Sequence, residues 1–470
     1  VSSLTKGSGD NRTFFSGNKE SPWYVVAFGM VGASLSGITF ISVPGDVGSI
    51  SLTYFQVVIG YLFGYFIVAF VLLPIYYKQN LTSIYQYLGD RFGRNSHMTG
   101  AFFFFVSRVL GAAFRLFLVA IVLQKFVFDS WGIPFEFTVT ISILLIWIYT
   151  FRGGIKTVVW TDTLQTFLMI LSVFLSIYFI TTSLDTGFVD FLYSEDFKTK
   201  SDIFITDSIL EKNHFIKSFL GGVFITICMT GLDQDMMQKN LTCRTLYDAQ
   251  KNMIVFSLIL VVVTFIFLIL GTLLFTYAEK NDILIPMLND RESTDLLFPQ
   301  IALNSGLNLT LSITFLLGLI AAAYSSADSA LTSLTTSFCI DFLDIEKKDA
   351  KIQKKLRFYV HILMSIFLII VILIYENYLS TSVIDSLLII AGFTYGPLLG
   401  LFAFGIFTDY KINDQLSIFV CIISVVIITI IFYLPETFLG GYKIGYELLP
   451  INGLITFFGL YLIRKRSPLN

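Results

Sequence analysis

Long apolar runs, separated by short polar segments, constrain this chain more than any other feature of its sequence. A helix needs about 20 mainly apolar residues to cross the hydrocarbon core of a bilayer. Such runs recur along the whole chain, at 23–43, 54–75, 101–128, 135–151, 158–183, 214–232, 252–278, 307–338, 359–376, 384–408, 416–434 and 450–463. The mean hydropathy of +0.77 and the low charged fraction of 14% are typical of membrane proteins. We therefore predict an all-α membrane protein with about twelve spans.

The rest of the sequence leaves little room for a separate soluble enzyme. The longest polar stretches, about 184–213 and 279–306, have mixed charges and are expected to be outside loops. The four cysteines are scattered and the three histidines are isolated, so the sequence predicts no metal cluster and no disulfides. It also has no phosphate-binding P-loop motif. We expect a membrane protein that is not an enzyme.

The distribution of Lys and Arg predicts the orientation in the membrane. Basic residues are more frequent in alternate segments between the runs, which places the amino end of the 23–43 run inside. The carboxyl end, with Arg464-Lys-Arg466, is then also cytoplasmic. The predicted location is the inner (plasma) membrane of a bacterium. Because the chain starts at Val1 with neither Met nor a cleavable signal, we expect that a preceding helix is missing.

The run at 307–338 is apolar at its start and unusually polar further on. It carries Ser325, Ser326, Asp328 and Ser329 at a depth where other spans have aliphatic residues. On a helix, Ser325 and Ser329 lie on one face. A carboxylate inside a membrane is costly unless it faces a partner, a water-filled path or a cation. Carboxylate, hydroxyl and carbonyl oxygens are the ligands that hard cations prefer, so the sequence predicts an ion site here.

Small and hydroxyl residues interrupt the first and the sixth runs. Gly29, Gly32 and Gly37 weaken a helix in the first run, and the segment 221–231 has the same character in the sixth. Two such interruptions in corresponding positions are typical of inverted-repeat transporters, whose unwound segments bind solute and ions near the membrane midplane. Close helix packing through glycine is the alternative interpretation.

Four sequence blocks resemble the sodium/solute symporter family, which includes bacterial sialic acid, proline and sugar carriers. The blocks lie at 14–23 running into 34–45, at 153–165, at 230–238 and at 321–337. Their order and spacing cover nearly the whole chain. Within the family, the pattern is most similar to that of the sialic acid carriers.

The resemblance implies a LeuT-like, five-plus-five inverted-repeat core with broken first and sixth helices, two additional carboxyl-terminal helices, and an extra amino-terminal helix that is missing here. The implied segments are a cytoplasmic lead-in (1–22), a first repeat (23–183), an outside loop (184–213), a second repeat (214–408) and two peripheral spans with a cytoplasmic tail (409–470).

The resemblance also implies one or two Na⁺ sites. The sodium site shared by the family would use the carbonyls or hydroxyls of Gly32, Leu35, Ala322, Ser325 and Ser326. A second site, found in some members, would use Asp162, Ser325, Asp328 and Ser329. Those members have serine where this chain has Asp328. Ion ligation, a salt bridge to an arginine and a position in a solvated cavity are all open for this aspartate.

The substrate is expected beside the interruption of the first run. The implied substrate-binding residues are Ser34, Ser36, Thr39, Tyr54 and Arg115. Arg115 resembles the arginine with which sialic acid carriers hold the substrate carboxylate, and a guanidinium can donate two parallel hydrogen bonds to such a group. A bridge from Arg115 to Asp162 or Asp328 is the alternative. Val58 stands where the sialic acid carriers have a glutamine.

These features predict a sodium-coupled secondary importer of a small organic anion, with sialic acid as the first candidate. The alternatives are a sodium-coupled symporter of a neutral sugar or an amino acid, and a membrane sensor that binds its solute without moving it. The expected partners are the solute, one or two Na⁺ ions and the lipid bilayer, with no nucleic acid. We expect the monomer to be the functional unit.

Overall fold

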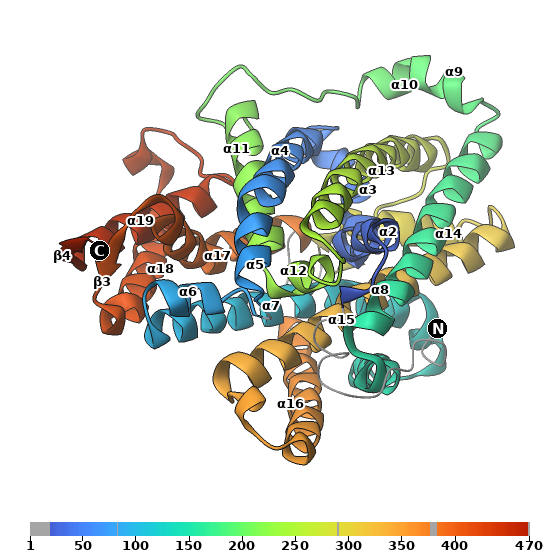
Figure 1. Cartoon of the computed structure of the whole chain (residues 1–470). Coiled ribbons are helices and arrows are strands. Elements are labelled where there is room, and N and C mark those ends of the chain that lie inside the picture. The colour runs from blue at the N-terminus through green and yellow to red at the C-terminus, as the bar shows by residue number, and fades with distance from the viewer. Residues whose placement is uncertain (1–18, 82, 289–290, 377–382, 469–470) are drawn as a thin grey trace.

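The computed structural model describes residues 19–81, 83–288, 291–376 and 383–468, and it is almost entirely helical (Figure 1). The lead-in predicted at 1–22 therefore lies largely outside the described residues. The α-helices are α2 (Trp23–Ser34), α3 (Gly37–Ile50), α4 (Tyr54–Ile67), α5 (Leu73–Gln79), α6 (Gln86–Arg91), α7 (Arg94–Leu123), α8 (Phe135–Ser183), α9 (Phe188–Tyr193), α10 (Glu195–Lys198), α11 (Phe215–Thr226), α12 (Gln234–Asn240), α13 (Leu246–Lys280), α14 (Leu297–Asn304), α15 (Leu309–Ser337), α16 (Ala350–Glu376), α17 (Val383–Phe407), α18 (Ser417–Tyr433) and α19 (Leu448–Leu462).

Shorter elements extend or join these helices. Four π-helical segments directly continue α4, α7, α11 and α15: η2 (Val68–Leu72), η3 (Gln124–Phe128), η5 (Ile227–Gly231) and η7 (Phe338–Phe342). Two short antiparallel pairs connect loops, β1 (Met287–Leu288) with β2 (Arg291–Glu292), and β3 (Tyr410–Ile412) with β4 (Arg464–Pro468).

Among the described residues, eight helical elements are long and apolar enough to cross a membrane, or up to ten if each of two bent pairs forms one span. Two shorter apolar helical stretches add to these, Phe135–Ile148 at the start of α8 and Leu448–Leu462, which is α19. The runs at 135–151 and 158–183, expected as separate spans, belong to the single helix α8. Its backbone stays helical between the two apolar stretches.

The two bends occur where the sequence has small and hydroxyl residues. The axes of α2 and α3 differ by 56°, and those of the α11–η5 segment and α12 by 68°. Between α2 and α3, Leu35 and Ser36 leave the helical conformation, and Ser36 is extended (φ −71°, ψ 176°). At the second bend, Tyr76 donates to the carbonyl of Gly231 (2.8 Å) and Tyr85 to that of Leu232 (2.9 Å). Buried tyrosines thus satisfy carbonyls that the bend removes from the helical ladder.

Glycines let the helices of the core approach closely. A Cβ on Gly32 of α2 would lie 2.1 Å from the Thr166 hydroxyl of α8. Between α4 and α11, a Cβ on Gly60 or Gly222 would lie 2.2 or 2.1 Å from a backbone oxygen of the other helix. Close backbone contact of this kind is how small residues join helices in membranes, where apolar side chains gain nothing by leaving lipid.

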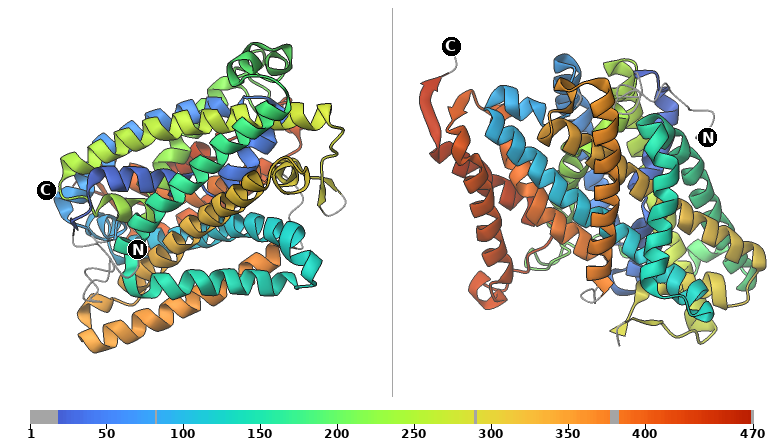
Figure 2. Two further views of the ribbon diagram at one scale, coloured as in Figure 1. Left: turned by 90° about the vertical axis from the view of Figure 1, so that its right-hand side faces the viewer. Right: turned by 90° about the horizontal axis from the view of Figure 1, so that it is seen from below.

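Two sets of helices pack together, one around α15 and one formed by the carboxyl-terminal helices. Helix α15 contacts α2, α3, α7 and α8, while α17, α18 and α19 contact one another. Figures 1 and 2 show this carboxyl-terminal group at one side of the molecule. The outer helices α16 and α18 expose large apolar side chains, which suits contact with lipid acyl chains. In α18 they include Phe419, Ile422, Ile423, Val426, Ile427 and Ile430.

Candidate substrate and cation sites

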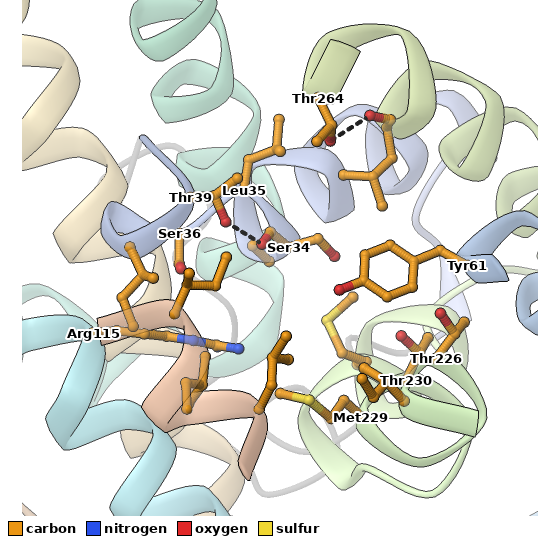
Figure 3. A pocket seen from close by; sticks show the side chains of 18 of the residues that line it. Ser34, Leu35, Ser36, Thr39, Tyr61, Arg115, Thr226, Met229, Thr230 and Thr264 are labelled. Carbon is orange, nitrogen blue, oxygen red and sulfur yellow. Dashed lines mark hydrogen bonds between the residues drawn. The ribbon is translucent and has the colours of Figure 1, made fainter. Parts of the chain in front are cut away.

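A pocket lies beside the break between α2 and α3. The space between its lining atoms, with the open mouth included, is about 760 Å³. Its walls come from α2, α3, α4, α7, α11, η5, α12, α13 and α17. Figure 3 shows Arg115 entering the pocket from one side and Tyr61 from the opposite side. The pocket is therefore polar on two walls and placed where the helix is interrupted.

The structure brings the five predicted substrate residues together. Ser34, Ser36, Thr39, Tyr54 and Arg115 all line this pocket. The Thr39 hydroxyl donates to the Ser34 carbonyl oxygen at 3.5 Å, across the break between α2 and α3. Ser34, Ser36 and Thr39 thus form the wall of the pocket that lies at this break. Their role in binding a solute stays a prediction.

Several other lining residues were not predicted. Five of them carry a hydroxyl group, Tyr61, Tyr65, Thr226, Thr230 and Thr264, and most of the others are apolar, among them Met229, Leu260 and Leu387. The Tyr54 and Tyr61 hydroxyls lie 3.0 Å apart. A signal for the tyrosines was present in the sequence, because Tyr54, Tyr61 and Tyr65 share one face of a helix. No local signal in the sixth run shows that its threonines face the same space.

Two arginines of α7 have different environments. Arg108 forms a buried ion pair with Asp235 of α12. Arg115 is also buried, with 9% of its surface exposed, yet it forms no ion pair or hydrogen bond with any residue that the structure describes, and its Nε lacks a partner. The alternative bridge from Arg115 to Asp162 is not formed. A buried, unpartnered guanidinium facing a pocket is suited to an anionic ligand.

The residues of the first predicted sodium site come from α2, the break and α15. A Cβ on Gly37 would lie 3.9 Å from the Ala323 nitrogen, so the start of α3 packs against this part of α15. The Ser326 hydroxyl is buried and has no hydrogen-bond partner among the described residues. An orphaned oxygen next to small residues and an unwound backbone fits a cation ligand, since buried polar atoms otherwise find a partner.

The residues predicted for a second sodium site surround a side chain that the sequence did not assign. The ammonium Nζ of Lys239, on α12, lies 2.8 Å from Asp162 Oδ2 and donates to the Ser329 hydroxyl at 2.6 Å. Ser325 donates to Asp162 Oδ1 at 2.6 Å. Ser329 is also 3.3 Å from Asp328 Oδ1. Both charged side chains are buried: Asp162 is 0% exposed and Lys239 is 1% exposed.

The start of α12 is fixed by further charged groups. Asp233 caps this helix by accepting from the backbone N–H of Asp235 at 2.8 Å, and it also accepts from the Tyr395 hydroxyl of α17. Together with the Arg108–Asp235 pair, these contacts tie α12 to α7 and α17. The polar run 233–239 is visible in the sequence, but only the 68° bend before α12 turns these side chains into the protein.

A profile of the sodium:solute symporter family matches residues 14–433. Among curated proteins, the chain is 26% identical to the sodium/sialic acid symporter NanT of Aliivibrio fischeri (84% of this chain, 77% of the relative). It is also 26% identical to the sodium/sialic acid symporter SiaT of Proteus mirabilis (88% and 82%). It is 25% identical to the mouse sodium-coupled monocarboxylate transporter 1 (86% and 65%).

Solved transporter structures show the same fold. A substrate-bound, outward-open Na⁺-coupled sialic acid symporter superposes with a TM-score of 0.82 at 22% identity, covering 99% of this chain and 95% of the other. Mhp1, a nucleobase-cation-symport-1 family transporter, gives 0.56 at 12% identity, with 97% and 95% covered. These likenesses confirm the predicted all-α, LeuT-like fold class.

Proposed function

Because this chain belongs to the sodium:solute symporter family, we propose that it imports a small organic anion, a carboxylate such as sialic acid, together with sodium ions. The observation that carries the choice of cargo is the buried Arg115, which faces the pocket without an ion pair among the described residues. The relatives named above are carriers of sialic acid or of monocarboxylates, and both cargoes have a carboxylate.

The other walls of the pocket favour a polyhydroxylated acid. Hydroxyl groups from α2, α3, α4, α11, η5 and α13 line the space that Arg115 faces, together with apolar side chains such as Leu260 and Leu387. They can donate to or accept from sugar hydroxyls, while the guanidinium takes the carboxylate. Sialic acid combines these two chemistries and is therefore the first cargo to test.

Sodium would bind where the break between α2 and α3 meets α15. The proposed ligands are the carbonyls of Gly32, Leu35 and Ala322 and the hydroxyls of Ser325 and Ser326, of which Ser326 has an orphaned oxygen. A cation at this place would hold the unwound segment against α15 and so complete one wall of the pocket. Binding of sodium and binding of cargo would then favour each other, as linkage requires.

The coupling would use the sodium gradient to accumulate cargo inside. Each net positive charge that moves inward through 100 mV contributes about 2.3 kcal/mol. We place the protein in the inner membrane of a bacterium, with a cytoplasmic carboxyl end and a monomeric transport unit, as the distribution of basic residues and the family resemblance indicate.

Two other functions use the same pocket. A symporter of a neutral sugar would leave the Arg115 charge without an anionic partner, whereas an amino acid would offer its carboxylate to Arg115 but bring an ammonium group as well. Val58 stands where the sialic acid carriers have a glutamine, so a cargo other than sialic acid must also be tested. A non-transporting sensor would bind the solute without accumulating it.

The test is uptake into proteoliposomes under an imposed sodium gradient, with labelled sialic acid, lactate, glucose and proline in parallel. We expect concentrative uptake of sialic acid or lactate, the two anionic carboxylates of the panel. We expect no uptake when potassium replaces sodium. Accumulation of glucose or proline alone would contradict the anion assignment. Binding without accumulation of any cargo would favour the sensor.

A further inference from the structure

Lys239 occupies the position that the sequence analysis assigned to a second sodium ion. Its ammonium group lies within 2.8 Å of Asp162 Oδ2 and 2.6 Å of the Ser329 hydroxyl, and both partners belong to the predicted ligand set. Asp328, another member of that set, lies with its Oδ1 3.3 Å from the Ser329 hydroxyl. We propose that the Lys239 ammonium is a built-in cation that replaces the second sodium ion, so that one sodium ion couples transport.

The hydrogen bonds of this cluster support that role. Ser325 donates to Asp162, and Ser329 accepts from Lys239 while it lies next to Asp328. Asp162 Oδ1 and the Ser325 and Ser329 hydroxyls are therefore already hydrogen-bonded, and Asp162 Oδ2 forms the ion pair with Lys239. The Ser326 hydroxyl, at the first predicted site, differs because it has no partner among the described residues. The second site differs in that its free oxygen, Asp162 Oδ2, faces the Lys239 ammonium at 2.8 Å.

Charge repulsion disfavours a free sodium ion beside the lysine. Two unit positive charges about 4 Å apart, at an effective dielectric constant of about 20, repel enough to weaken binding by about a thousandfold. Arg108 does not relieve this repulsion, because it is itself a cation and pairs with Asp235. An ammonium on a covalent tether also needs no ion from solution, so the cluster is charged in the same way at every sodium concentration.

The alternative interpretation is that the Lys239–Asp162 ion pair has a purely structural role. A buried pair holds α12 against α8 and α15 whether or not the site resembles a sodium site. The two readings differ in what happens when the positive charge is removed. A cation surrogate, once neutralised, leaves two carboxylates and two hydroxyls around a space that sodium can enter. A purely structural pair leaves a destabilised protein with the same number of bound ions.

This inference rests on the proposed sodium coupling and deepens it. One sodium ion moving with one monoanion carries no net charge, so transport by the wild type would be electroneutral. Two sodium ions would carry one net positive charge for each anion. The membrane potential should therefore leave the wild-type rate unchanged and should accelerate a variant that has regained the second ion.

The decisive experiment counts bound ²²Na⁺ per folded protein in detergent, without cargo. Lys239→Gln removes the charge at nearly constant size, Lys239→Arg keeps the charge, and Asp162→Asn combined with Lys239→Gln keeps the pair neutral. We expect one ion for the wild type, two for Lys239→Gln, and one for each of the other two variants. Size-exclusion chromatography selects the folded fraction of each protein.

Two ions on the wild type, or one ion on folded Lys239→Gln, would overturn the proposal. If Lys239→Gln does not fold, the wild-type number still decides between one ion and two. A wild type and a folded Lys239→Gln that both bind no sodium would reject the proposed sodium coupling itself. Failure of this inference is therefore distinguishable from failure of the proposed sodium coupling.

Discussion

At the scale of single residues, the choice of cargo depends on one guanidinium. Arg115 is buried, faces the pocket and is without an ion pair among the described residues, whereas its neighbour Arg108 is neutralised by Asp235. Keeping an unpaired charge inside a membrane protein is costly, and the cost is offset when an anionic ligand binds. The difference between these two arginines is therefore a functional difference between residues on the same helix.

Replacing Arg115 with lysine should weaken binding of a carboxylate cargo about 10- to 100-fold. Lysine keeps the charge but cannot donate two parallel hydrogen bonds, and a hydrogen bond to a charged group is worth about 1.5–3 kcal/mol. The measurement is the cargo concentration that gives half-maximal uptake. Arg94→Gln is the control, because Arg94 pairs with Asp344 at a half-exposed position and should leave that concentration unchanged. An unchanged value in Arg115→Lys would favour a neutral cargo.

The residues that the sequence could and could not predict differ in a physical way. Ser34, Ser36 and Thr39 were predicted because they lie at the interruption of the first run, and Tyr54 and Arg115 because they match positions of the sialic acid carriers. Lys239 also shows as polar, but at the end of a run, where a lysine ordinarily reaches water. The bend before α12 turns it inward, and a bend of this kind depends on tertiary contacts such as those of Tyr76 and Tyr85.

At the scale of elements, close contacts between helix backbones hold the core together. Gly222 of α11 packs against the Val57 carbonyl and the Gly60 Cα of α4, and these are rigid backbone atoms. The sequence predicts where the apolar runs are, because hydropathy and length suffice for that. It does not predict that the helix continues from 135 to 183, since the polar stretch between the two apolar runs is as compatible with a loop as with a helix.

Gly222→Ala should destabilise the protein by about 1–3 kcal/mol, the usual cost of overpacking. A Cβ there would lie 2.1 Å from the Val57 carbonyl oxygen, so α4 and α11 must separate. Gly111→Ala in α7 is the matched control, because its Cβ would meet only Leu387 at 3.5 Å. Thermal unfolding in detergent should give a lower midpoint for Gly222→Ala and an equal or higher one for Gly111→Ala. Equal midpoints for the two variants would show that the close contact is not structural.

At the scale of the whole molecule, the break between α2 and α3 connects the two sites. The same unwound segment contributes Ser34 and Ser36 to the pocket and Leu35 to the first proposed sodium site. A sodium ion bound there would order the wall on which the cargo rests. Sodium and cargo are therefore expected to be coupled through one short segment rather than through a distant relay.

The measurement that tests this account most directly is uptake of a labelled carboxylate, sialic acid first, under a sodium gradient by wild type and by Ser326→Ala. Removing the orphaned hydroxyl takes one ligand from the proposed first sodium site and leaves the pocket unchanged. We predict that half-maximal uptake needs at least tenfold more sodium in the variant, since a charge-assisted ligand is worth about 1.5 kcal/mol or more. Uptake that is independent of sodium in the wild type, or equally sodium-dependent in both proteins, would contradict coupling through this site.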